Sequence, residues 1–216
     1  MHKTINNLIQ IQKEIKSNNL NSISKIIAVS KTFSMESISP LIEYGHVDFG
    51  ENKVQEAIDK WTEVKKKNSI IKLHMIGKLQ SNKVKHAVKI FDFIHSLDNI
   101  KLAQKISEEQ NKLKKNIKLF IQINVGNENQ KSGIKISELP DFYNTCINKF
   151  NLEIIGLMCL PPANVDPTLF FEKMNKVSKD LSLKELSMGM SSDYLKAIKY
   201  DASYLRIGSK IFGERS

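Results

Sequence analysis

Residues 26–45 have the sequence IIAVSKTFSMESISPLIEYG, and this stretch contains one complete strand–turn–helix unit. The apolar run at 26–29 has no polar alternation, which is typical of a strand covered on both faces. Ser34 is a good N-cap for a helix that we predict to end near Tyr44, where Gly45 follows. A buried strand followed by a helix is the repeating unit of a parallel α/β fold.

The same alternation continues along the chain. We predict further strands at about 47–49, 71–76, 91–95, 117–124, 153–159, 184–188 and 203–207. Helices are predicted before the first strand, starting at Thr4, and then at about 52–67, 81–89, 99–114, 136–149, 167–180 and 192–199. Eight strands, each followed by a helical segment, favour a single (β/α)8 TIM barrel over an open doubly wound sheet. One barrel would occupy residues 1–216 as a single domain, and the absence of G-x-G-x-x-G argues against a dinucleotide fold.

The composition is ordinary for a globular protein except for its charge. The chain has 33 Lys and Arg against 23 Asp and Glu, a formal net charge of +10, which raises nucleic acid or an acidic membrane surface as partners. However, 31 of the 33 basic residues are lysines dispersed along the chain, whereas bidentate recognition of phosphate favours arginine. We therefore expect a solvated, lysine-rich surface, with no nucleic acid and no membrane as partner.

Other classes of protein are excluded by simple patterns. The longest nearly apolar run, 154–163, is about half of the ~20 residues that a membrane helix needs. The first residues lack the apolar segment of a secretory signal, so we expect a cytoplasmic protein. Cys146 and Cys159 lie in no CxxC or histidine cluster, and we expect two reduced thiols and no metal site.

Lys31 is the first candidate functional residue, because it directly follows the first predicted strand. In a barrel, the residues after the strands build the active face. A lysine that is removed from water has a lowered pKa and can form a Schiff base with an aldehyde. The alternative is a structural lysine whose stem is buried while its amine reaches water.

The last two strand–helix turns predict a phosphate site. Ser187 and Gly189 lie at the end of the seventh predicted strand, and Gly208 and Ser209 follow the eighth. Helix starts after these two strands frequently bind phosphate in (β/α)8 barrels. The alternative is that the glycines only form turns and that a serine such as Ser191 only caps a helix.

Arg206, near the end of the eighth strand, would enter the same mouth. A buried arginine needs an acceptor, such as a phosphate oxygen or a heteroaromatic nitrogen, unless a carboxylate from elsewhere in the fold pairs with it. An imine-forming lysine, a phosphate cradle and an arginine in one mouth together suggest pyridoxal 5′-phosphate (PLP).

Seven segments of the chain, taken together, resemble the YggS/PROSC family of pyridoxal phosphate homeostasis proteins. In order, they are IAVSKT at 27–32, GENKVQE at 50–56, HMIGKLQSNK at 74–83, NVGNENQKSG at 124–133, GLM at 156–158, SMGMS at 187–191 and RIGSKIFG at 206–213. The resemblance implies a barrel like the N-terminal domain of alanine racemase, with PLP held as a Schiff base on Lys31. The cofactor-binding residues that it implies are Lys31, Asn52, Ser187, Arg206, Gly208 and Ser209. Asn52 would lie near the ring and Arg206 at the pyridine nitrogen, and the other three would contact the phosphate.

The resemblance further implies a role in intracellular PLP homeostasis, with no turnover and no catalytic residues. Arg206 agrees with this, because a guanidinium does not give up its proton and so leaves the pyridine nitrogen unprotonated, a weaker electron sink. A racemase needs an acid/base group on each face of the substrate carbon, and we expect no second β domain of the kind that alanine racemases use. A small PLP-dependent amino-acid racemase is the alternative function.

Partners follow from the same resemblance. We expect a monomer that binds PLP and that delivers it to apo-enzymes needing the cofactor. Three lysines in the mouth loops, Lys78, Lys83 and Lys131, are candidates for holding a second cofactor molecule.

Overall fold

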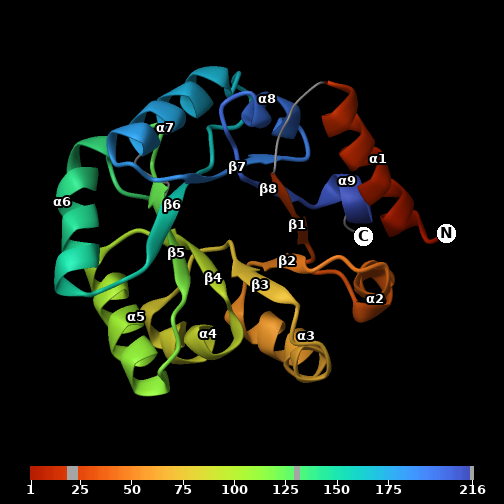
Figure 1. Ribbon diagram of the computed structural model, residues 1–216, viewed down its shortest axis with the longest axis horizontal. Helices are drawn as coiled ribbons and strands as arrows, with labels where there is room; N and C mark the ends of the chain where they lie inside the picture. Colours follow the sequence, from red (N-terminus) through yellow and green to blue (C-terminus); the bar gives the residue numbers. More distant parts are fainter. Residues whose placement is uncertain (19–23, 129–131, 215–216) are drawn as a thin grey trace.

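The computed structural model describes residues 1–18, 24–128 and 132–214, and these contain a closed barrel of parallel strands (Figure 1). Neighbouring strands pair in chain order, and the last strand pairs with the first. The strands are β1 (Lys25–Val29), β2 (Asp48–Glu51), β3 (Lys72–Met75), β4 (Phe93–Leu97), β5 (Lys118–Ile123), β6 (Ile154–Cys159), β7 (Glu185–Met190) and β8 (Tyr204–Ile207). The predicted (β/α)8 barrel is confirmed, and the open sheet is excluded.

Helices surround the barrel. They are α1 (Lys3–Ser17), α2 (Met35–Glu43), α3 (Val54–Lys67), α4 (Val84–Ile90), α5 (Ile100–Leu113), α6 (Leu139–Asn144), α7 (Thr168–Asp180), α8 (Tyr194–Ile198) and α9 (Ser209–Phe212). The helix predicted at 136–149 is divided into a 3-10 turn, α6 and a π-helical turn. The strand predicted from residue 91 begins at Phe93, because the Phe91 amide still donates to the Ala87 carbonyl at the end of α4.

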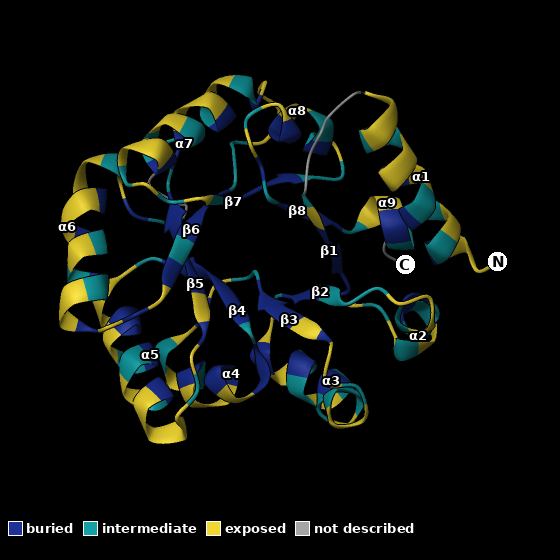
Figure 2. Ribbon diagram, viewed as in Figure 1, coloured by how far each residue is buried: buried dark blue, intermediate teal, exposed yellow. Residues whose placement is uncertain are grey.

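Burial follows the spacing of apolar residues. Figure 2 shows buried residues on the strands and on the inner faces of the helices, with exposed residues facing outward. In α3, Val54, Ala57 and Trp61 are three or four residues apart and therefore share one buried face. A second, smaller apolar cluster fills the barrel itself, and its members are Ile27, Phe93, Phe120, Met158 and Tyr204.

The N-terminal helix completes the wall beside the last strand. In the described residues the strand β8 is followed by the short α9, and α1 lies next to α9 (Figure 1). The Asn7 amide donates to the Ile211 carbonyl at 2.8 Å, and Lys210 donates to the Glu14 carboxylate at 2.8 Å. The Tyr194 hydroxyl also donates to Glu14. The bonds from Lys210 and Tyr194 lower the pKa of Glu14 to about 2, so this carboxylate anchors α9 as an anion.

Within the described ranges, no helix combines the length and the apolar character that crossing a bilayer requires. No three potential ligands among His, Cys, Asp and Glu gather there into a group that could hold a metal ion. Cys146 and Cys159 are buried and form no disulfide, and burial raises the pKa of each thiol to about 12.

Candidate functional site

A cavity of about 580 Å3 lies at the carboxyl ends of the strands. Its lining comes from β1, β7 and β8, from the segments that follow β1, β2, β3, β6 and β7, and from α9 and its flanking residues. The lining residues are Val29, Lys31, Phe33, Asn52, Ile76, Leu160, Met190, Ser191, Ser192, Arg206, Gly208, Ser209, Gly213 and Glu214. The cavity thus brings together five of the six predicted site residues, namely Lys31, Asn52, Arg206, Gly208 and Ser209, but not Ser187.

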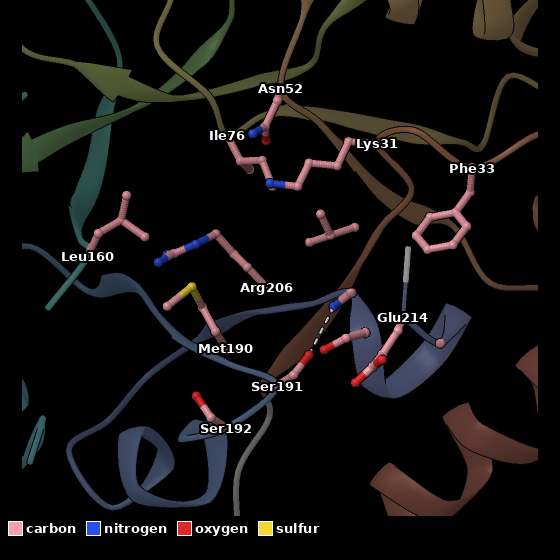
Figure 3. A pocket seen from close by; sticks show the side chains of 14 residues that line it. Lys31, Phe33, Asn52, Ile76, Leu160, Met190, Ser191, Ser192, Arg206 and Glu214 are labelled. Atoms are coloured by element: carbon pink, nitrogen blue, oxygen red, sulfur yellow. Dashed lines mark hydrogen bonds between the residues drawn. The ribbon is translucent and has the colours of Figure 1, made fainter. Parts of the chain in front are cut away.

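Lys31 lies in the turn directly after β1, where the sequence predicted it. Figure 3 shows its side chain extending into the cavity, as does that of Asn52, while Arg206 enters from β8. The residue is half-buried, so its aliphatic stem is sheltered by the cavity wall. An amine from the turn after β1 and a guanidinium from β8 therefore face the same space.

Lys60 of α3 stabilises the turn that carries Lys31 through hydrogen bonds to its backbone. The Lys60 amine donates to the Ser30 carbonyl at 2.9 Å and to the Phe33 carbonyl at 3.3 Å. It also forms an ion pair with Glu51 at 2.8 Å. The same Glu51 oxygen accepts bonds from the Ser30 hydroxyl at 2.8 Å and from the Trp61 indole at 3.0 Å. Glu51 is fully buried, so this group of bonds is shielded from water.

Thr32 is the one residue of this turn with a left-handed backbone, with φ of 66°. Its amide donates to the Glu56 carboxylate at 2.5 Å, and Glu56 in turn accepts from Lys60 at 2.9 Å. A left-handed threonine is unfavourable unless neighbouring bonds impose it. The first turn of α3 therefore helps to determine the direction in which Lys31 leaves the backbone.

Arg206 is only 4% exposed, and its side chain is held at two points. One terminal nitrogen donates to the Ser187 hydroxyl at 2.6 Å, and the other donates to the Cys159 carbonyl at 2.7 Å. In the described part of the chain no carboxylate forms an ion pair with Arg206, so the carboxylate partner considered above is excluded there. Burial lowers the pKa of Arg206, but a guanidinium remains charged at neutral pH. These described bonds use two of the five N–H donors of Arg206.

A cluster of backbone amides lies at the ends of β7 and β8. The amides of Gly208 and Lys210 both donate to the Ser191 hydroxyl at 3.3 Å. Gly189, with φ of 88°, and a shift in the pairing of β7 with β8 turn the chain before Ser191. A side chain at Gly189 would place its Cβ 2.7 Å from Ala197, so glycine is required. Converging amides and a hydroxyl suit an anion such as phosphate.

Ser187 has a different place from the one that the sequence suggested. It is fully buried beneath the cavity, where it contacts Arg206 and His95. Two serines that follow it, Ser191 and Ser192, line the cavity instead, and the sequence suggested such a serine only as a helix cap. The difference arises because the bend at Gly189 turns the residues after it toward the mouth.

Asn52 borders a second cavity of about 350 Å3 next to the first. The two cavities share the lining residues Asn52, Ile76 and Leu160. A Cβ on Gly77 would lie 2.5 Å from the Asn52 carbonyl, so only glycine allows this close approach. Of the three lysines proposed for a second cofactor molecule, Lys78 lines this cavity and Lys83 lines neither. Lys131 lies outside the described residues.

Sequence reasoning missed the polar side chains inside the barrel. Asp48, His74 and His95 come from β2, β3 and β4 and form a hydrogen-bonded series with Ser187. A usable signal was present, because side chains alternate along a strand, so Asp48 and Phe49, which packs outward on Trp61, lie on opposite faces of β2. Applying this alternation to each predicted strand would have marked the interior polar positions.

Comparison with known sequences gives one consistent result. A family model described as "Alanine racemase, N-terminal domain" matches residues 5–216. The chain is 36% identical to the pyridoxal phosphate homeostasis protein of Pasteurella multocida, over 97% of this chain and 96% of that protein. It is 32% identical to the Escherichia coli K12 protein of the same name, over 88% of this chain and 85% of that protein.

Solved structures agree with the sequence comparison. PipY of Synechococcus elongatus PCC7942, solved with PLP bound, is 30% identical and superposes with a TM-score of 0.88, covering 98% of this chain and 100% of PipY. An alanine racemase of Clostridium difficile superposes with a TM-score of 0.76, over 99% of this chain and 57% of the racemase. At 16% identity, the racemase shows the fold alone.

Proposed function

This chain belongs to the alanine racemase N-terminal domain family and, within it, to the pyridoxal phosphate homeostasis proteins, and from this premise we propose that its cavity binds PLP through Lys31. The protein then acts in the homeostasis of this cofactor and not as an enzyme that turns over a substrate. The observation that carries the proposal is the joint placement of Lys31, Arg206 and the amide cluster around Ser191 in one cavity.

The residues present fit PLP in both size and chemistry. The cavity volume of about 580 Å3 lies within the range of small-molecule and cofactor sites. Its three polar groups suit the three polar groups of PLP. The Lys31 amine suits the aldehyde, and the Arg206 guanidinium suits the ring nitrogen. The amides and hydroxyl around Ser191 suit the phosphate. Val29, Ile76 and Leu160 provide apolar walls for the ring.

When bound, PLP supplies an aldehyde and a pyridine ring that withdraws electrons strongly only when its nitrogen is protonated. Lys31 would hold PLP through its amine, since an amine forms a C=N bond with an aldehyde while the carbonyl oxygen leaves as water. Ser191, Gly208 and Ser209 would contact the phosphate, and Asn52 would lie beside the ring.

Arg206 supports binding without turnover. It would donate an N–H to the ring nitrogen and keep its own proton, so that the nitrogen would remain unprotonated. No tyrosine or histidine is found among the described residues that line the cavity, so the second acid/base group of a tyrosine-dependent racemase is not provided there. Both observations favour a carrier over the racemase alternative.

The proposal includes a monomeric, cytoplasmic protein of one domain, residues 1–216, whose recipients are apo-enzymes that need the cofactor. The two unpaired, buried thiols are in keeping with a reducing compartment. Mixing the PLP-loaded protein with an apo-enzyme, and following the recovery of that enzyme's activity, tests the delivery step. Recovery no faster than with an equal concentration of free PLP would contradict direct transfer.

The binding proposal is tested with the purified protein and PLP. We expect a visible absorbance band to develop on titration, borohydride to fix the adduct, and peptide mapping to place the added mass on Lys31. The absence of a band, or an adduct mapped to another lysine, would overturn the proposal. A chiral assay over a panel of amino acids checks turnover, and racemisation faster than that by free PLP would favour the racemase.

Ser191→Ala is expected to weaken PLP binding about tenfold, because it removes a hydroxyl from the amide cluster that would hold the charged phosphate. Pyridoxal, which lacks the phosphate, should bind wild type and variant equally, as measured by absorbance titration. Ser192→Ala is the matched control, because in the described structure its hydroxyl accepts no amide hydrogen bond. An equal loss of affinity for pyridoxal would show that Ser191 does not act through the phosphate.

A further inference from the structure

A series of hydrogen bonds crosses the barrel interior from its amino end to Arg206. Asp48, in the first position of β2, lies 3.0 Å from His74 Nε2. His74 Nδ1 lies 3.0 Å from His95 Nε2, and His95 Nδ1 lies 2.8 Å from the Ser187 hydroxyl. The Ser187 hydroxyl lies 2.6 Å from an Arg206 nitrogen. Five side chains from five strands are therefore joined end to end.

The chemistry of the two ends determines the direction of every bond between them. Arg206 can only donate, so the Ser187 oxygen accepts its N–H, and the Ser187 O–H is available for His95 Nδ1. His95 then carries its proton on Nε2 and donates to His74 Nδ1. His74 in turn carries its proton on Nε2 and donates to Asp48, which as a carboxylate can only accept. All the donors and acceptors are matched with both histidines neutral.

The surroundings favour this neutral, ordered state. His74 and His95 are fully buried, and burial lowers the pKa of each, most strongly for His95, which also lies near the charge of Arg206. His74 stacks on Phe93 with ring centroids 4.3 Å apart, and His95 stacks on Phe120 at 4.2 Å. The rings have little freedom to turn, so each nitrogen keeps its partner.

We propose that Asp48, His74, His95 and Ser187 are positioning residues that orient the Arg206 guanidinium and direct its remaining N–H groups into the cavity. The inference rests on the proposed function only for what Arg206 meets there, the PLP ring nitrogen. The Asp48 carboxylate determines which nitrogen of each histidine ring carries the proton. The last acceptor of the series is the Ser187 oxygen, which accepts from Arg206. This hydrogen-bonded series does the orienting that a carboxylate partner performs for many buried arginines.

The proton order is tested without any cofactor by long-range 1H–15N NMR of the histidine rings at pH 7. We expect both His74 and His95 to be neutral, with the proton on Nε2. A charged ring, or a proton on Nδ1 of His95, would overturn the inference. Because this measurement uses the wild-type protein, it does not depend on a variant that folds.

Asp48→Ala tests whether the Asp48 carboxylate determines the tautomer of His95, a residue that it does not contact. Without an acceptor for its Nε2–H, His74 is expected to populate the other tautomer, and the 15N signals of His95 should then shift toward an average of the two forms. Glu185→Ala is the matched control, because Glu185 is a half-buried carboxylate at the amino end of β7 with no described hydrogen bond to either histidine. Unchanged His95 signals in Asp48→Ala would contradict the inference.

Ser187→Ala breaks the link next to Arg206 and tests its consequence for the cavity. We expect the dissociation constant for PLP to rise about tenfold and the pH profile of the bound absorbance band to change, while borohydride still fixes the adduct on Lys31. Wild-type affinity and an unchanged pH profile would overturn the positioning role. A wild-type protein that forms no adduct at all would instead contradict the proposed function, and the NMR result would still stand by itself.

Discussion

Lys31→Ala is expected to abolish the covalent attachment of PLP completely. The amine of Lys31 is the group that the turn after β1 directs into the cavity, and alanine supplies no nitrogen for a C=N bond. After incubation with PLP and borohydride, mass spectrometry of the variant should show no PLP adduct on any residue that lines the cavity. Reversible binding should persist with lower affinity, because the amides around Ser191 and the donors of Arg206 remain.

The matched control is Lys78→Ala, which removes a lysine from the neighbouring cavity. Its absorbance band and its adduct should equal those of wild type. If Lys31→Ala kept the band unchanged, Lys31 would not be the attachment point. If instead Lys78→Ala lost the band, the reactive lysine would belong to the second cavity.

Lys60→Met is expected to lower the free energy of unfolding by about 3 kcal/mol. The variant leaves Glu51 as a fully buried carboxylate without its cation, and one of its oxygens already lacks a hydrogen-bond partner among the described residues. Breaking a buried ion pair on one side costs more than the pair contributes, because the remaining charge stays desolvated. Urea denaturation followed by circular dichroism measures the change.

Two further variants separate the buried charge from other effects of losing a lysine. Lys60→Met combined with Glu51→Gln removes both charges and should recover most of the loss. Lys66→Met breaks the pair with Glu63 on the same helix, where both side chains are largely exposed, and should leave stability almost unchanged. Equal losses for Lys60→Met and Lys66→Met would contradict the role assigned to burial.

Lys60→Met also has a functional consequence, because the same amine holds the carbonyls of Ser30 and Phe33 on either side of Lys31. Without it, the turn should sample more conformations, and the rate of adduct formation with PLP should fall. The double variant, although more stable, should remain slow. A normal rate in Lys60→Met would show that the turn holds its shape without Lys60.

The barrel was predictable because its determinants are local. The run at 26–29 is apolar without alternation, as a strand buried on both sides requires, and the helix that follows lies between Ser34 and Gly45, although the Ser34 side chain makes no capping hydrogen bond. Repeated eight times, this pattern leaves few ways to arrange parallel strands. The weak point was the last unit, because the sequence of α9 does not reveal that α1, distant in the chain, would lie against it.

The site was predictable wherever strand topology alone places a residue. Lys31, Arg206 and Gly208 lie in or just after strands, and the carboxyl ends of all strands meet at one mouth, so their common location followed from the fold class. The sequence did not predict which serine of the turn after β7 faces the cavity. The positive φ of Gly189 and the shifted pairing of β7 with β8 direct Ser191 toward the mouth and leave Ser187 beneath it.

By itself, the amino-acid sequence determined the barrel, the end at which the cavity lies, and the lysine and arginine that line it, because periodicity and strand ends are local properties. Only the tertiary structure decided the support of these two residues. Glu51 and Lys60 form an ion pair next to the turn that carries Lys31, and His95 is hydrogen-bonded to Ser187, which is 92 positions away in the sequence. Such pairs depend on barrel closure and on which face of each strand points inward. Hydrogen bonds between distant strands form only when both conditions are satisfied at once.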